Sequence, residues 1–298
     1  MARQTADDFD PEVLRLFDQY VHGAIDRRGF LERAARYAAG ATGAVALLAA
    51  LSPKFAEAQQ VKPDDRRIGA ERREFDSPQG YGKASGYLVR PAEAAGQLPL
   101  VLVAHENRGL NPHIEDVARR FALAGYIAFA PDALFPIGGY PGDEDAARAK
   151  FATLDQAKVR EDFRAAAKLL QGLHGGTGKV GAIGFCWGGG MVNWLAVHDA
   201  GIAAAVPFYG VAPPLDDVDL ANVKAELLLV FAANDERVNA TWPAYEAALK
   251  AAHVKYEAVT YPGTQHGFHN DTTPRYDEQA AHDAWKKSLA LFGRVLRA

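Results

Sequence analysis

Short apolar runs alternate with amphipathic stretches along most of the chain, from residue 82 to the end. A short apolar run between polar or glycine residues is typical of a buried strand, whereas apolar residues about three to four positions apart are typical of a helix. The pattern predicts strands over 82–90, 100–105, 126–132, 179–185, 203–210, 226–233 and 255–263. It predicts helices over 113–124, 143–171, 187–199, 242–252 and 275–297.

This alternation of strands and helices predicts one doubly wound α/β domain, with a mostly parallel sheet covered by helices on both faces. The run at 100–105 is almost wholly apolar, as a central parallel strand would be. In such a sheet, reactive groups lie just beyond the C-terminal ends of the strands. The charged stretch 64–74 precedes the first expected strand, and we expect it to lead into the fold.

Residues 1–58 differ from the rest of the chain. Residues 38–51 carry no charge, but they are fewer than the roughly 20 apolar residues of a membrane-spanning helix, so no stable membrane span is expected. The pair Arg27-Arg28 precedes this run and the small-x-small sequence Ala56-Glu57-Ala58 follows it. This order is typical of a twin-arginine export signal. We therefore expect a periplasmic or otherwise exported protein, cut after Ala58 to leave a single domain over 59–298.

The charge of the N-terminal segment leaves a second interpretation open. Residues 1–26 contain six acidic side chains, whereas the first part of an export signal is normally basic. The alternative is an amphipathic arm of N-terminal helices, beginning near residue 9, which packs on the body of a cytoplasmic protein and is never removed.

Composition excludes several classes of protein. The 298 residues are 49% hydrophobic and carry a formal net charge of −4, without any Lys/Arg-rich run, so a nucleic-acid surface is not expected. A single cysteine excludes an intrachain disulfide and a site built from several cysteines. No dinucleotide fingerprint or phosphate loop occurs in the sequence. The glycine-rich stretch Gly175–Gly178 precedes a strand and does not open a helix, so it is expected to be a turn. We expect no cofactor and either a monomer or a homodimer.

The most specific motif is Gly184-Phe185-Cys186-Trp187-Gly188, which lies between an expected strand and an expected helix. It matches the nucleophile elbow, Gly-x-nucleophile-x-Gly, with cysteine in place of serine. Bulky residues at the two glycine positions would clash in so sharp a turn. The N–H groups at the start of the following helix favour a thiolate over a thiol. A lone cysteine is otherwise a small buried residue, but this position predicts that Cys186 is a nucleophile.

A nucleophile of this kind needs a histidine base and an acid that orients the base, in the chain order nucleophile, acid, histidine. Asp235 directly follows an expected buried strand, with Glu236 as the alternative acid. His266 follows the last expected strand, with His269 as the alternative base. The order predicts a triad of Cys186, Asp235 and His266. An oxyanion hole would come from the backbone N–H after the nucleophile and one from the loop after an early strand.

The N–H after the nucleophile belongs to Trp187. The N–H from the loop is expected to be that of Asn107, in the sequence His-Glu-Asn-Arg-Gly at 105–109. Aromatic residues near the expected strand ends are candidate walls of a substrate pocket, with ordinary core packing as the alternative. These candidates are Phe135, Tyr140, Trp187 and Phe268.

These motifs together resemble the dienelactone hydrolase family (carboxymethylenebutenolidases), a branch of the α/β-hydrolases. The resemblance spans about residues 70–298 and rests on HENRG, PDALF, GFCWGGG, FAANDERV and YPGTQHGF. It implies an α/β-hydrolase fold and cleavage of a carboxylic ester or lactone through a thioester on Cys186. It also implies a catalytic role for Glu106, which matches a glutamate that contacts the resting thiol in the family. A carboxylate beside a thiol disfavours a second negative charge, so such a glutamate would keep the resting cysteine in its thiol form.

The chain departs from the family at the residues that bind the substrate. Family members that act on dienelactone hold its carboxylate with two arginines, and neither is present at the matching position here. The stretch 131–136 contains no arginine, and Asn270 stands four residues after His266. Arg108 or Arg237 could substitute for them in space. The resemblance therefore predicts an ester- or lactone-cleaving enzyme and only weakly dienelactone as substrate.

Two other functions are possible from the sequence. A metal-dependent hydrolase could use ligands drawn from His105, Glu106, His266 and His269, but their spacing is not a standard metal motif and Cys186 would be left without a role. A non-catalytic binding protein could keep the same fold, but it would not need the order of nucleophile, acid and histidine. We therefore expect a cysteine hydrolase without a metal.

Overall fold

The computed structural model describes residues 3–38, 40–54, 59–94, 96–198, 201–216 and 218–297. Its strands are β1 (Ile68–Ser77), β2 (Gly82–Pro91), β3 (Leu98–Ala104), β4 (Ile127–Pro131), β5 (Gly176–Phe185), β6 (Ile202–Phe208), β7 (Glu226–Asn234) and β8 (Tyr256–Gln265). They form one sheet in the order β1-β2-β4-β3-β5-β6-β7-β8. The pairs β1–β2 and β2–β4 are antiparallel and all other neighbours are parallel. This mostly parallel α/β sheet confirms the predicted fold class.

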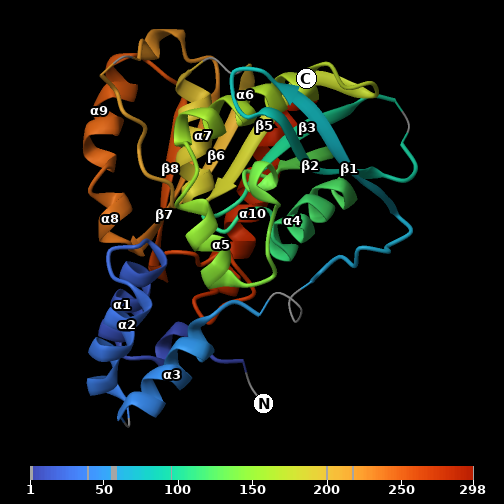
Figure 1. Ribbon diagram of the computed structural model, residues 1–298. Coiled ribbons are helices and arrows are strands. Elements are labelled where there is room, and N and C mark those ends of the chain that lie inside the picture. Colours follow the sequence, from blue (N-terminus) through green and yellow to red (C-terminus); the bar gives the residue numbers. More distant parts are fainter. Residues whose placement is uncertain are drawn as a thin grey trace.

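Helices cover both faces of the sheet (Figure 1). One face packs against α5, α6, α7 and α9, and the other against α4 and α10. Each helix turns an apolar stripe to the sheet; in α4 the stripe includes Ile114, Val117 and Phe121, all fully buried. The helices are α4 (Pro112–Leu123), α5 (Glu144–Phe151), α6 (Gln156–Gln171), α7 (Trp187–Val197), α8 (Glu236–Asn239), α9 (Trp242–Ala251) and α10 (Glu278–Leu296), with 3-10 turns η4 (Phe135–Ile137) and η5 (Leu220–Asn222).

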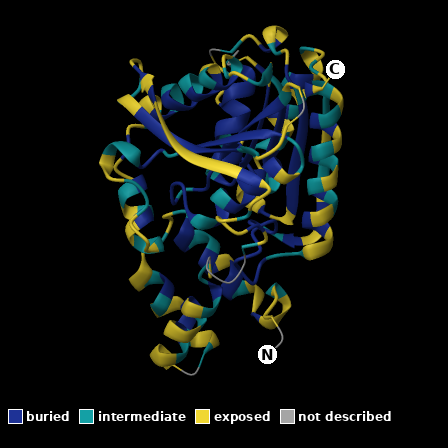
Figure 2. Cartoon of the chain, turned by 90° about the vertical axis from the view of Figure 1, so that its right-hand side faces the viewer, coloured by how far each residue is buried: buried dark blue, intermediate teal, exposed yellow. Residues whose placement is uncertain are grey.

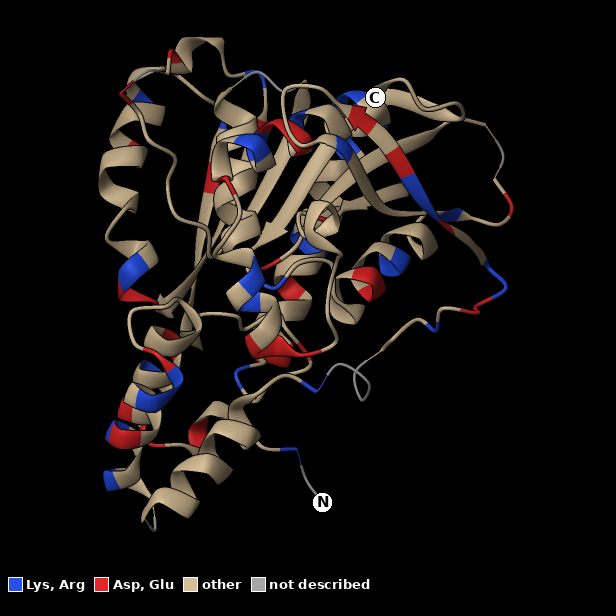
Figure 3. Ribbon diagram, in the orientation of Figure 1, with Lys and Arg blue, Asp and Glu red and all other residues tan. Residues whose placement is uncertain are grey.

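The structure corrects three details of the predicted elements. The charged stretch expected to be a leader contains β1, an edge strand whose residues from Gly69 to Glu74 are exposed (Figures 2 and 3). Because this strand packs little of its length on the core, it lacks the apolar alternation that marks a strand. The helix expected over 143–171 is divided into α5 and α6, because Asp155 accepts hydrogen bonds from two N–H groups and starts a new helix. The expected turn at Gly175–Gly178 is largely the beginning of β5.

Residues 3–38 and 40–51 form a separate helical unit, the N-terminal arm, which packs against the body near the end of β7 (Figure 1). Its helices are α1 (Pro11–Val21), α2 (Arg27–Ala34) and α3 (Gly40–Leu51), with 3-10 turns η1 (Ala6–Asp8) and η2 (Ala35–Tyr37). Phe17, Phe30 and Leu48, one from each helix, are at most 3% exposed and meet in an apolar cluster of the arm's own.

Export and removal of the arm stay predictions. The sequence Ala56-Glu57-Ala58, where cleavage is expected, lies outside the described residues. Among the described residues, no single helix is long and apolar enough to cross a membrane. The segments Arg27–Tyr37 and Gly40–Leu51 are long and apolar enough for a membrane span only when they are taken together, and a bend of 112° separates them.

The backbone is crowded at the junction between β5 and α7. A Cβ atom on Gly184 would lie 2.2 Å from the carbonyl oxygen of Gly188. A Cβ atom on Gly188 would lie 2.4 Å from the carbonyl oxygen of Ala104, at the end of β3. Both distances are far shorter than a van der Waals contact, so only glycine allows β3, β5 and α7 to approach this closely.

This crowding predicts that Gly188→Ala lowers the free energy of unfolding by about 1–3 kcal/mol, the usual cost of overpacking a close-packed site. Gly69→Ala is the matched control, because a Cβ atom there has no neighbour within 4 Å. Urea unfolding of both variants measures the difference. Equal stability of the two variants would contradict the role of Gly188 in the packing.

Candidate active site

Cys186 occupies the sharp turn between β5 and α7. Its backbone has φ +58° and ψ −116°, a strained conformation for a residue with a side chain. The turn is held because the Cys186 N–H donates to the carbonyl oxygen of Phe208, at the end of β6, over 3.1 Å. The thiol therefore lies at the C-terminal edge of the sheet, beside the N-terminus of α7, and the residue is 9% exposed.

The structure brings Asp235 and His266 together beside this thiol. Because β7 and β8 are parallel neighbours, the residues that follow them meet at one edge of the sheet. The His266 Nδ1 lies 2.5 Å from the Asp235 Oδ2, and both side chains are buried. The potential ligand atoms of His266 and Cys186 lie within 4.8 Å of each other.

The alternative acid, Glu236, and the alternative base, His269, do not form such a pair. Glu236 begins α8 and is exposed. His269 is buried in aromatic packing, stacked on Phe185 with ring centroids 4.9 Å apart.

Electrostatics at the site favour a thiolate–imidazolium pair. Burial raises the pKa of the Cys186 thiol, but His266 and His22 outweigh burial and lower that pKa to about 5. Burial lowers the pKa of His266, but the thiolate and the Asp235 carboxylate outweigh it and raise that pKa to about 10. Between these values the sulfur is negative and the His266 ring is positive.

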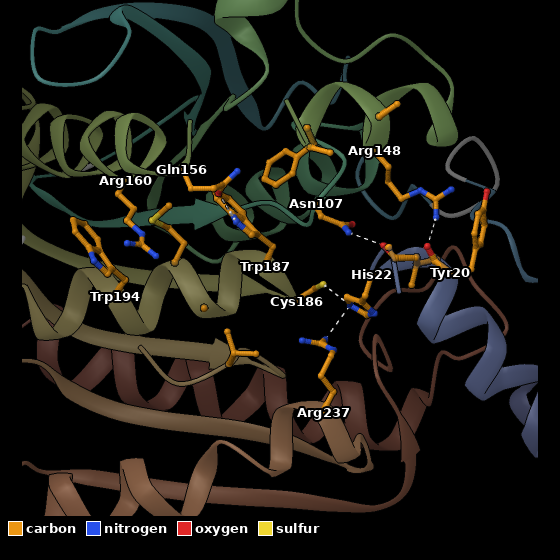
Figure 4. A pocket seen from close by; sticks show the side chains of 18 of the residues that line it. Tyr20, His22, Asn107, Arg148, Gln156, Arg160, Cys186, Trp187, Trp194 and Arg237 are labelled. Carbon is orange, nitrogen blue, oxygen red and sulfur yellow. Dashed lines mark hydrogen bonds between the residues drawn. The ribbon is translucent and has the colours of Figure 1, made fainter. Parts of the chain in front are cut away.

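A second histidine at the thiol, His22, comes from the N-terminal arm. Its Nε2 lies 3.4 Å from the Cys186 Sγ and 3.0 Å from an Arg237 guanidinium nitrogen (Figure 4). No signal in the sequence indicates this contact, since His22 lies within the segment interpreted as an export signal and no spacing links it to an elbow 164 residues later.

The two residues expected to form an oxyanion hole line the same cavity as Cys186. Trp187 is the first residue of α7, so its backbone N–H has no partner within the helix. Asn107 follows β3, and its side chain donates to the carbonyl oxygen of Val21 in the arm over 2.8 Å. The indole of Trp187 is fixed by donating to Gln156 over 3.0 Å.

A cavity of about 760 Å³ opens onto the thiol between the arm and the body (Figure 4). The arm supplies one part of the wall, with Tyr20–Gly23, Ile25 and Asp26. The body supplies the rest, from α5, α6 and the start of α7 and from the loops that contain Asn107, Cys186, 211–214 and Arg237.

The expected pocket residues Phe135, Tyr140, Phe268 and Arg108 do not line this cavity, which corrects that prediction. Phe268 is fully buried among Phe208, Tyr209 and Tyr261, so it belongs to the core. The Tyr140 hydroxyl donates to Glu144, and Arg108 is held in ion pairs with Glu144 and Glu106. Phe135 begins η4. The sequence could not show that the arm, and not this region, faces the thiol.

Glu106 is buried beside the site but bonds to groups other than the thiol. Its Oε2 accepts from the Asn270 amide over 3.1 Å and pairs with Arg108 over 3.5 Å. Asn270 thus helps to hold the glutamate in place.

The four residues of the metal alternative are not gathered around one point. Both ring nitrogens of His105 are engaged, with Nδ1 2.5 Å from the Glu106 carbonyl oxygen and Nε2 accepting from the Ala133 N–H. Among the described residues, the set that could hold an ion is His22, Cys186 and His266.

Comparison with known proteins gives the family. The model of the dienelactone hydrolase family matches residues 84–296. The chain belongs to this family. It is thus a hydrolase of the carboxylic ester and lactone class, as predicted. A second family model, described as YqhI-like, matches residues 1–39 of the arm.

Individual relatives agree with this assignment. An Escherichia coli K12 protein provisionally named a carboxymethylenebutenolidase is 32% identical over 245 residues, 77% of this chain and 88% of the relative. A hydrolase fragment from the same strain, provisionally named YghX, is 56% identical over 105 residues, 35% of this chain and 90% of the fragment. The crystal structure of a Klebsiella pneumoniae protein provisionally named a dienelactone hydrolase superposes with a TM-score of 0.64 at 30% identity, covering 76% of this chain and 99% of that one.

The lowered pKa of Cys186 predicts unusual reactivity of the thiol in the folded protein. Because the sulfur is a thiolate above about pH 5, its alkylation by iodoacetamide should rise through pH 5 and level off well below pH 8. Cys186 is the sole cysteine, so the intact mass reports this one site.

The urea-unfolded chain is the control, in which the same thiol should titrate near the ordinary value of about 8.5. Alkylation of the folded protein that follows the unfolded profile would show that the imidazoles do not stabilise the thiolate.

Proposed function

We propose that this hydrolase cleaves a carboxylic ester or lactone through a thioester on Cys186, with Asp235 and His266 completing a catalytic triad. The observation that carries the proposal is the buried Asp235–His266 pair, 2.5 Å apart, placed beside a cysteine on a strained elbow. Buried carboxylate, imidazole and nucleophile in this order are the components of acyl transfer.

The first half of the reaction forms the thioester. The Cys186 thiolate attacks the carbonyl carbon, and the π electron pair moves to the oxygen. The backbone N–H groups of Trp187 and Asn107 stabilise this oxyanion, a contribution of about 10²–10³ in rate for one donor. The carbon–oxygen bond of the ester then breaks, and the leaving oxygen takes a proton from an imidazolium.

The second half releases the acid. A neutral imidazole accepts a proton from water, the water oxygen attacks the thioester carbon, and the thiolate leaves. The order of the triad assigns this proton transfer to His266, whose ring is fixed by Asp235.

The cavity indicates the substrate class. Around the thiol its walls are mostly apolar, with the side chains of Phe151, Trp187, Met191 and Trp194. We therefore infer an ester or lactone with a bulky apolar group. Of the two arginines expected to hold the substrate, Arg237 lines the cavity and contacts His22 beside the thiol, whereas Arg108 is held by two carboxylates. An anionic group on the substrate would meet Arg237.

The triad predicts that Cys186→Ala remains folded but loses aryl-ester hydrolysis by at least about 10³-fold. Asp235→Asn should lower kcat by about 10²-fold or more, because the His266 ring loses the carboxylate that orients it and stabilises its charge. Steady-state kinetics on p-nitrophenyl esters measure both.

Glu236→Gln is the matched control, since this neighbouring carboxylate is exposed and should leave kcat unchanged. Full turnover by Cys186→Ala would overturn the proposed function.

A further inference from the structure

His22 is held at the nucleophile in the same way as the triad histidine. Its Nε2 lies 3.4 Å from the Cys186 Sγ, and its Nδ1 lies 3.2 Å from the Asp18 carboxylate and 2.8 Å from the Asp18 carbonyl oxygen. Asp18 is one turn earlier on α1, so the pair is built into one helix end. Two aspartate–histidine pairs, Asp18–His22 and Asp235–His266, therefore converge on one sulfur, and the two imidazole rings meet edge to face 4.6 Å apart.

The arm is fixed to the body around His22. The carbonyl oxygens of Tyr20 and Val21 accept from Arg148 and Asn107, over 3.1 and 2.8 Å. The Tyr20 hydroxyl bonds to Asp145, which also pairs with Arg27 of α2. Because Tyr20 and Val21 directly precede His22, these contacts fix the position of its ring at the thiol.

The arm forms a wall of the substrate cavity without filling it. Both His22 and Cys186 line the cavity of about 760 Å³, whereas His266 does not. His266 instead faces a second cavity of about 840 Å³, which His22 and Arg237 also line. A substrate that reaches the thiol through the first cavity therefore meets the ring of His22 and not that of His266.

We propose that His22 is a second catalytic acid–base residue, supplied by the arm. In place of His266, to which the order of the triad alone assigns these proton transfers, His22 serves the leaving group and the water, while His266 stabilises the thiolate. This proposal rests on the proposed function. When the tetrahedral intermediate collapses, the carbon–oxygen bond breaks and the leaving oxygen takes the Nε2 proton of His22. The neutral ring then accepts a proton from the water that attacks the thioester, and the thiolate leaves. His22 ends the cycle protonated, as it began.

The charged groups around His22 stabilise both the protonated and the neutral form of its ring. Asp18 and the thiolate favour the protonated ring, whereas Arg237 and the positive His266 favour the neutral one. Burial lowers the pKa of His22, but the thiolate and Asp18 outweigh burial and raise it. An Arg237 guanidinium nitrogen, 3.0 Å from Nε2, can donate to the ring once its proton has gone to the leaving group.

The test is the leaving-group dependence of His22→Gln, since Gln can keep a hydrogen bond to sulfur but cannot transfer a proton. A poor leaving group needs a proton as it departs, whereas a p-nitrophenolate does not. The value of kcat/KM should fall by about 10²-fold for an alkyl ester and only slightly for the p-nitrophenyl ester of the same acid. Glu32→Gln, on the exposed face of the arm, is the matched control and should change neither value.

Two further measurements separate a loss of proton transfer from a loss of the folded site. Alkylation of Cys186 by iodoacetamide at pH 7 should stay within a few-fold of wild type in His22→Gln, which shows that the folded site and its thiolate persist. Asp18→Asn keeps the ring but removes its carboxylate, so it should give a smaller loss with the same preference for alkyl esters. This variant also tests the proposal if His22→Gln fails to fold.

Three outcomes would overturn the proposal. Equal losses on alkyl and aryl esters, or no loss, would mean that His22 only shapes the cavity. Faster turnover by His22→Gln would mean that the arm inhibits the enzyme. A wild-type protein that cleaves neither ester would overturn the proposed function and this inference with it.

Discussion

A negative sulfur buried in protein is stable only where nearby charges and hydrogen-bond donors replace the water it has lost. Cys186 has such surroundings on two sides, from His266 after β8 and from His22 at the end of α1. Each ring is fixed in turn by a carboxylate, Asp235 or Asp18. The position of the arm, the closeness of β7 and β8 and the strained elbow all converge on the stabilisation of this one atom.

The closeness of Cys186, Asp235 and His266 could be predicted because it follows from local chemistry and chain order. Gly184 and Gly188 mark the turn, since no other residue fits there, and Asp235 and His266 follow strands that the apolar pattern reveals. Parallel neighbours then bring those strand ends together. The edge strand β1 escaped prediction because exposure on both sides removes the periodic signal.

The arm could not be predicted in the same way. The pattern of charges and the apolar run at 38–51 describe the composition of the segment, and an export signal and a packed helical unit share that composition. Nothing in local spacing places His22 beside a residue 164 positions later, or makes Tyr20 and Val21 part of the cavity wall. Of the expected pocket residues Trp187 lines the cavity, whereas Phe135, Tyr140, Phe268 and Arg108 do not, and the part of the wall that the arm supplies was missed. If His22 takes part in the reaction, the arm must remain on the working enzyme, which favours the retained arm over a cleaved signal.

If acyl transfer passes through the Cys186 sulfur, the first turnover should leave an acyl group on that atom. Wild-type protein mixed with an activated aryl ester and quenched in acid at short times should gain the mass of one acyl group. Peptide mapping should place that group on Cys186, and neutral hydroxylamine should remove it, as expected for a thioester. Formation of the acid product during that first turnover while Cys186 stays unmodified at every time point would contradict the account.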